Sequence, residues 1–167
     1  MELIIEELKL TCIHTLKENH NKIKASLEKL SDEAVWWRPN QQSNSMGNII
    51  LHLCGNITQY ILCGLGGAED HRTRSKEFEE QGPINIQDLL IQLDQTLEKV
   101  YAIIHQCNET DLLNKKQIQI YHISGVNILV HVTEHFSYHT GQIVYYTKMK
   151  SGESLNFYDD KKMDRKR

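Results

Sequence analysis

Three histidines in the last third of the chain have a spacing that suits metal binding. His131, His135 and His139 follow one another at steps of four residues. Four residues of an α-helix advance the side chain by only about 40°, so the three imidazoles lie on one helix face. Side chains at this spacing have Cβ atoms roughly 5–6 Å apart, close enough for two imidazoles to bind one ion.

A fourth histidine, His52, lies in an otherwise apolar stretch, residues 49–53. That context predicts a buried imidazole on a second helix, and helical bundles assemble metal sites from side chains on facing helices. The alternative is that the histidines are core residues with ordinary hydrogen-bond partners, or polar residues on an exposed helix face. Because burial of several imidazoles without partners would leave polar nitrogens unsatisfied, a metal site is a serious hypothesis, but the spacing alone leaves both interpretations open.

The same helix contains a pattern typical of one class of zinc peptidase. Residues 131–135 read HVTEH, which matches the inverted motif H-x-x-E-H with Glu134 as the general base. Such an enzyme needs a third ligand from a distant carboxylate, and a sheet or second lobe that holds an extended peptide. Few residues follow His135 and the sequence predicts no such sheet, so a metallopeptidase is the least favoured interpretation.

Apolar residues that recur at steps of three and four predict four long helices. These helices are expected over residues 5–30, from an N-cap at Ser45 to the glycines at 64–67, over 90–107, and from 124 to about 150. The fold class that follows is all-α, a four-helix bundle, with a long loop between the second and third helices.

The connections and the end of the chain carry less apolar periodicity. Residues 69–80 are charged and are expected to form a solvated loop, with room for a helical turn. Residues 117–123 alternate polar and apolar, but a lone strand cannot form a sheet, so they are predicted to be an extended connection. Residues 1–150 are expected to form one metal-binding domain. Residues 151–167 are expected to form a polar tail that frays, with a disordered basic end at 161–167.

The composition is that of an ordinary globular chain. Its 167 residues are 40% hydrophobic and 25% charged, with a formal net charge of −3, so no global positive charge favours nucleic acid. No apolar stretch approaches the roughly 20 residues that span a bilayer, and the N-terminus is acidic, so neither a membrane span nor a secretory signal is expected. The four cysteines are well separated and are expected to be free thiols of a cytoplasmic protein, with Cys54 and Cys63 in the core.

Three segments resemble the DinB/YfiT-like superfamily of metalloenzymes. They are NSMGNIILHLCGN at 44–56, RTRSKEF at 72–78 and HVTEHFSYHTGQI at 131–143. The histidine spacing is similar to the pattern of the superfamily, and the asparagine, glycine and Arg-x-Arg pieces resemble a subgroup of unassigned function. The resemblance covers residues 36–158.

The resemblance implies a four-helix bundle, commonly dimeric, that binds a divalent metal, often zinc or nickel, through three histidines. Carried over residue by residue, the ligands are His52, His135 and His139, whereas His131 lies behind the ligands or in the pocket. Thr140 stands where many relatives carry arginine, which leaves an anion-binding role at that position open. Relatives of known activity include S-transferases and isomerases that use low-molecular-weight thiols.

Three amides are candidates for the pocket or for hydrogen bonds that orient the ligand imidazoles. Asn56 and Gln59 lie one and two turns after His52, and Gln142 lies three residues after His139. The alternative is that they are ordinary polar residues in a helix seam.

Arg72 and Arg74 could bind an anionic substrate or the carboxylate of a thiol, because guanidinium groups bind carboxylates through two parallel hydrogen bonds. The alternative is that both belong to a solvated run of charges. No residue of the sequence can be assigned as a catalytic group.

The sequence therefore favours a divalent-metal-dependent enzyme of the thiol S-transferase or hydrolase type, acting on a small molecule as a homodimer. A low-molecular-weight thiol is the cosubstrate that the resemblance implies. The alternative is a non-catalytic metal-binding module of a stress response or a sensor.

Overall fold

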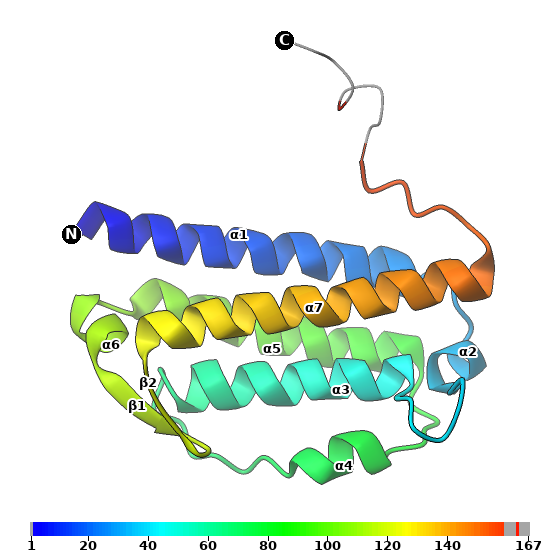
Figure 1. Ribbon diagram of the computed structural model, residues 1–167, viewed down its shortest axis with the longest axis horizontal. Helices are drawn as coiled ribbons and strands as arrows, with labels where there is room; N and C mark the ends of the chain where they lie inside the picture. The colour runs from blue at the N-terminus through cyan, green and yellow to red at the C-terminus, as the bar shows by residue number, and fades with distance from the viewer. Residues whose placement is uncertain (1, 159–162, 164–167) are drawn as a thin grey trace.

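The computed structural model describes residues 2–158 and residue 163, and these are mostly helical (Figure 1). The elements are α1 Glu2–Leu27, α2 Asp32–Trp36, α3 Met46–Ile57, the π-helical η1 Thr58–Cys63, α4 Arg74–Glu79, α5 Ile86–Gln106, α6 Glu109–Leu113, β1 Lys115–Ile118, β2 Tyr121–Ser124 and α7 Gly125–Ser151.

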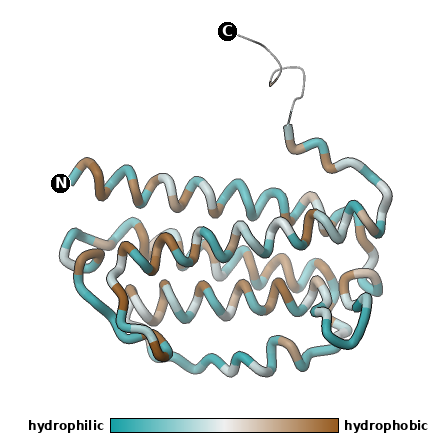
Figure 2. Tube along the Cα trace, in the orientation of Figure 1, coloured by the Kyte–Doolittle hydropathy of each residue, from teal (hydrophilic) through white to brown (hydrophobic). Residues whose placement is uncertain are grey.

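The four long helices α1, α3, α5 and α7 lie side by side (Figure 1). Helix α7 packs along α1 and contacts α3, while α5 packs against both α3 and α1. Their facing sides are apolar, and the largest side chains that are wholly buried include Leu16, Ile50, Leu97 and Phe136. In Figure 2, hydrophobic residues recur along each long helix, whereas the segment that carries α4 is mostly hydrophilic. The bounds of the long helices lie within a few residues of those that the periodicity predicts.

Helix α3 begins where the sequence predicts it. The Ser45 side chain accepts a hydrogen bond from the Asn48 backbone N–H, and the Asn48 side chain accepts one from the Ser45 backbone N–H, which completes a capping box. Asn48 is fully buried, and its amide also donates to the carbonyls of Glu77 and Glu80. The start of α3 therefore anchors the end of α4.

The charged segment 69–80 contains a short helix, α4, where a helical turn has room, but it is not the solvated loop that the sequence predicts. Helix α4 lies along α3 (Figure 1). The side chains of Arg72 and Glu77 are only 6% and 10% exposed. Opposite charges that neutralise each other can be buried. A run of charged residues in the sequence does not reveal that Arg72 and Glu77 form such a pair.

The region 115–124 also corrects the prediction, because it is a two-stranded antiparallel hairpin and not an extended connection. Lys115 pairs with Ser124 and Ile118 pairs with Tyr121, so the strand finds its partner a few residues further along the chain. Gln119 has a φ of 53° and forms the turn without the glycine or asparagine that usually marks one. The fold is therefore helical with one hairpin, and not purely α.

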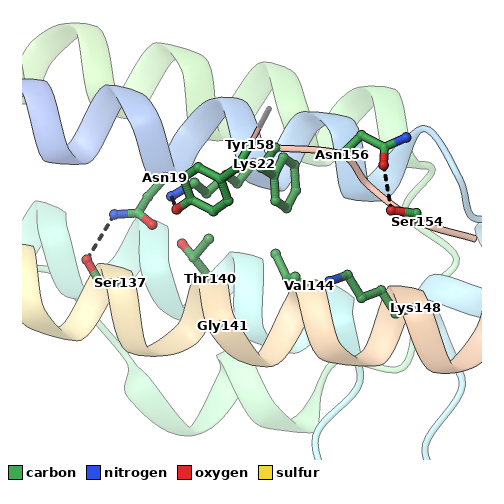
Figure 3. Close-up of a pocket in the computed structure, with 11 residues that line it drawn as sticks. Asn19, Lys22, Ser137, Thr140, Gly141, Val144, Lys148, Ser154, Asn156 and Tyr158 are labelled. Atoms are coloured by element: carbon green, nitrogen blue, oxygen red, sulfur yellow. Dashed lines mark hydrogen bonds between the residues drawn. The ribbon is translucent and has the colours of Figure 1, made fainter. Parts of the chain in front are cut away.

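The segment after α7 packs back on the helices in its described part, whereas the sequence predicts that the whole tail frays. Ser154 and residues 156–158 line a pocket of about 460 Å³ together with α1 and α7 (Figure 3). Lys22 of α1 donates a hydrogen bond of 3.1 Å to the Tyr158 hydroxyl. Most of the predicted basic end, 161–167, lies outside the described residues.

Among the described residues, no helix has both the length and the apolar character that crossing a bilayer requires.

Candidate metal centre

Three imidazoles from two helices converge between α3 and α7. His52 of α3 meets His135 and His139 of α7, and one nitrogen from each ring lies within 4.8 Å of the others. The Nε2 atoms of His52 and His135 are 3.1 Å apart. His139 completes the group, with its ring centroid 4.5 Å from that of His135 and 5.1 Å from that of His52.

A buried carboxylate sets the orientation of the His52 ring. Glu77 Oε2 lies 2.9 Å from His52 Nδ1. An ionised carboxylate can only accept a hydrogen bond, so Nδ1 carries the proton and donates it. The lone pair of His52 therefore lies on Nε2, which points at the other two imidazoles.

Arg72 holds this carboxylate through two hydrogen bonds, from Nε to Oε1 at 2.7 Å and from Nη2 to Oε2 at 2.9 Å. Burial by itself raises the pKa of the Glu77 carboxyl, but the hydrogen bonds and charges of Arg72 and His52 outweigh it and lower the pKa. Arg72 Nη1 also donates to Gln59 Oε1 at 2.8 Å. Glu77 therefore stays ionised, and its carboxylate is held by His52 and by Arg72.

Gly55 makes the approach of this carboxylate possible. A Cβ atom at Gly55 would overlap Glu77 Oε1 and crowd the Arg72 Nε atom. The absence of a side chain one turn after His52 lets the carboxylate lie against the backbone of α3.

The second oriented ring is that of His139. Its Nδ1 donates to Gln142 Oε1 at 2.7 Å, which leaves its Nε2 as the atom with a lone pair. Hydrogen bonds of this kind to the outer nitrogen are the usual support of histidine ligands.

The imidazoles of α7 are neutral at ordinary pH. Burial, followed by the neighbouring imidazoles and Arg72, lowers the pKa of His135 to about 3. Burial also lowers the pKa of His139. Metal ligation requires neutral imidazole, so the rings are in the state that can bind a cation.

The donor set fits a divalent metal ion. Two nitrogens at about 2.0–2.1 Å from one tetrahedral zinc ion are roughly 3.3 Å apart, close to the Nε2–Nε2 distance of 3.1 Å between His52 and His135. Without an ion, one of these two nitrogens must carry a proton toward the other.

A pocket of about 530 Å³ opens beside the three histidines. His131 lies in it, one turn before His135, and its ring stacks on Tyr60 with centroids 4.4 Å apart. The Nε2 atom of His131 is buried and has no hydrogen-bond partner among the described residues. The pocket walls come from α3, η1, α7, the hairpin, the segment before α4 and the first residue of α4. The lining residues are His52, Asn56, Tyr60, Arg72, Arg74, Gln119, Tyr121, Ile123, Asn127, His131 and His135.

Comparison with known proteins places this chain in a family. The family described as "Protein of unknown function (DUF1572)" matches residues 6–158. The chain belongs to the DUF1572 family. No curated protein matches it.

Several solved structures share the fold of this DUF1572 chain. A conserved protein from Enterococcus faecalis has a TM-score of 0.73 at 15% identity, over 86% of this chain and 97% of that one. The DinB-like protein YjoA from Bacillus subtilis has a TM-score of 0.65 at 19% identity, over 86% and 94%. A DinB-like protein from Bacillus cereus has a TM-score of 0.67 at 14% identity, over 86% and 93%. The resemblance to DinB-like proteins is thus confirmed, and at such low identity the likeness shows the fold alone.

The structure brings the three predicted amides of this DUF1572 chain to the site or its supports. Asn56 lines the pocket, and Gln142 contacts His139. Gln59 accepts from Arg72 and, through Nε2, donates to Asp70 at 2.6 Å.

Arg74 differs from Arg72 in its surroundings. It lines the pocket and its guanidinium lies over the Phe78 ring, 4.8 Å from the centroid. It has no carboxylate partner among the described residues.

Other residues of this DUF1572 chain lie away from the three-histidine group. Glu134 is exposed, and Tyr145 is exposed by 73%. Tyr138 is also 63% exposed, but it contacts the group: its ring centroid lies 5.0 Å from that of His139, and its hydroxyl accepts from Gln142 Nε2 at 3.2 Å. Cys54 is buried as predicted, whereas Cys63 is half-buried and not a core residue.

The sequence prediction missed Glu77, although this residue lies within the segment RTRSKEF that resembles the superfamily. Nothing in its neighbourhood distinguishes a buried acid from a solvated one. The only signal is the pairing of that segment with a glycine one turn after His52.

The low pKa of His135 predicts acid sensitivity of the metal-free protein. The pKa is about 3 in the folded chain against 6.5 for an ordinary histidine, so between these values the unfolded chain binds more protons. The stabilising contribution is fully present above about pH 6.5 and is lost as the pH falls toward 3. We expect the free energy of unfolding, measured with urea, to fall from about pH 7 to pH 4, and to fall less steeply in His135→Gln. Equal slopes for the two proteins would contradict this assignment.

Proposed function

We propose that the chain binds one divalent cation through His52, His135 and His139 and uses it as an enzyme on a small molecule, in a transferase or hydrolase reaction. The observation that carries this proposal is the convergence of three imidazoles beside an open pocket. Zinc and nickel are the proposed metals, since both accept imidazole ligands. The four-helix bundle of residues 1–150 is the proposed metal-binding domain.

Three protein ligands are the pattern of catalytic sites and not of closed structural ones. An ion held by these three histidines would supply Lewis-acid activation of water or of a thiol. A low-molecular-weight thiol is therefore the proposed cosubstrate of a transfer reaction.

The chain's own residues orient the ligand imidazoles and neutralise the carboxylate behind His52. Glu77 fixes the proton of His52 on Nδ1, and Gln142 does the same for His139, so both rings present Nε2. Arg72 neutralises Glu77, which leaves the charge of the ion uncompensated by the residues around it. Asn56 and His131 present polar atoms to the pocket.

One observation favours a non-catalytic metal-binding module instead. Among the described residues, the carboxylate that contacts the histidines is Glu77, and its oxygens are already held by Arg72 and His52. The site therefore shows no carboxylate that is free to act as a general base. The exposure of Glu134 also removes the base that a metallopeptidase would require.

A homodimer in the cytoplasm stays part of the proposal. The exposed aromatic rings of Tyr138 and Tyr145 on the outer face of α7 are compatible with a contact between copies.

The first prediction concerns the ligand set. Protein purified without a histidine tag and dialysed against trace zinc or nickel is expected to hold one ion per chain, as measured by elemental analysis. His52→Ala, His135→Ala and His139→Ala should each lose nearly all of it, because two imidazoles hold an ion far more weakly than three. His131→Ala should keep it. Loss in His131→Ala with retention in His139→Ala would overturn the assignment and revive the inverted peptidase motif.

The second prediction concerns the carboxylate behind His52. Glu77→Gln is expected to weaken metal affinity by about 10–100-fold, the usual effect of removing such a partner, as measured by competition with a chelating dye. Gly55→Ala should act in the same direction, because the new Cβ displaces the carboxylate. Glu79→Gln is the matched control, since Glu79 is exposed on the same helix. Equal affinities for Glu77→Gln and Glu79→Gln would show that the carboxylate does not support the ligand.

The third prediction separates an enzyme from a binding module. Metal-loaded protein is assayed against a panel of small electrophiles and esters, with and without a low-molecular-weight thiol. We expect turnover that His135→Ala abolishes. An absence of turnover across the panel in a fully loaded protein would count against the enzyme and favour the module.

A further inference from the structure

The pocket beside the three histidines has an unbalanced charge. Its lining, given above, includes two arginines and no aspartate or glutamate. Ligand imidazoles are neutral, so they would not reduce the charge of a bound divalent ion. Whatever enters this pocket meets two guanidinium groups and no carboxylate in the lining itself.

The two arginines contribute differently to that charge. Arg72 is nearly buried and shares two hydrogen bonds with Glu77, so its charge is neutralised within the protein. Arg74 has no carboxylate within 4.0 Å among the described residues, and its guanidinium lies over the face of Phe78. Stacking on the ring holds the guanidinium plane and leaves its N–H groups available at the edges. Arg74 is therefore the cation of the pocket that a ligand can use.

A further polar group in the pocket lacks a partner. The buried Nε2 atom of His131 has none among the described residues. The Asn56 amide also lines the pocket. Buried polar groups without partners are uncommon in folded proteins, and a ligand with hydrogen-bonding groups would satisfy His131 Nε2. This observation is independent of the charge and also indicates a polar ligand.

The wall opposite α7 is held in place by hydrogen bonds. Gln119, at the tip of the hairpin, donates from Nε2 to Gln59 Oε1 at 2.7 Å. Gln59 is in turn bonded to Arg72, so the hairpin is fixed to the same network that holds Glu77. The pocket is a built cavity and not a gap under a loose turn.

We propose that this pocket takes a small organic anion, with its carboxylate or similar group bound by Arg74 and its reacting group near the three histidines. The inference rests on the proposed metal centre and adds to it the charge class of the substrate. Arg74 acts here as a residue that determines specificity, because it contacts the substrate and not the ligands of the ion.

Two matched probes test this inference. Succinic acid monohydroxamate and its terminal amide carry the same hydroxamate, which chelates divalent ions, and differ only in the charge of the far end. Their affinities for the cobalt-loaded full chain are measured by calorimetry, and the cobalt absorption spectrum reports separately whether the ion is bound. We expect the acid to bind at least about tenfold more tightly than the amide, as a charge-assisted hydrogen bond to arginine implies.

Variants test whether Arg74 causes the preference for the acid probe over the amide probe. Arg74→Gln should remove the preference by weakening the acid probe while leaving the affinity for the amide probe unchanged, and Arg74→Lys should restore part of it. Lys76→Gln is the matched control, because Lys76 is exposed on the same helix and does not line this pocket. It should keep the full preference.

The outcomes distinguish the two proposals. A chain that shows no cobalt spectrum overturns the metal centre and this inference with it. A loaded chain that binds both probes equally leaves the metal centre standing and overturns the anionic substrate alone. A preference that persists in Arg74→Gln, or one that Lys76→Gln also removes, refutes the role of Arg74.

Discussion

The arrangement of the site depends on one carboxylate that lies between an imidazole and a guanidinium. A buried charge is tolerated only when a partner neutralises it, and Glu77 is paired with Arg72 while it accepts from His52. Removal of either partner would leave an uncompensated charge in a nearly closed space. The segment between η1 and α5 is for this reason part of the site and not a connection around it.

The same hydrogen bonds join elements that are far apart in the sequence. Gln59 uses both ends of its amide, because Oε1 accepts from Arg72 and Gln119 while Nε2 donates to Asp70. The π-helical turn, the hairpin and the helix that carries His52 are thus linked by one chain of polar contacts. Linked bonds of this kind polarise one another, so the network favours a single arrangement of the pocket walls over many looser ones.

The sequence predicts the part of this structure that follows from apolar periodicity and capping. The four long helices and the N-cap at Ser45 follow from spacing, because burial repeats with the period of the helix. The grouping of His52 with His135 and His139 is what the resemblance to the DinB/YfiT-like superfamily implies, since the spacing alone leaves it open. The hairpin is not predicted, because its turn uses Gln119 in a left-handed conformation that glycine or asparagine usually adopts. Glu77 and the burial of Arg72 are not predicted, because hydropathy scores each residue alone, whereas the burial of this pair results from mutual neutralisation.

Gly55 has a consequence for how the sequence of such a protein can change. The carboxylate of Glu77 occupies the volume that any side chain at Gly55 would need. A larger residue there could persist only if the acid became shorter or moved along α4. Positions 55 and 77 are therefore expected to vary together among homologous chains, as a coupled pair whose members are separated by a loop and a helix boundary.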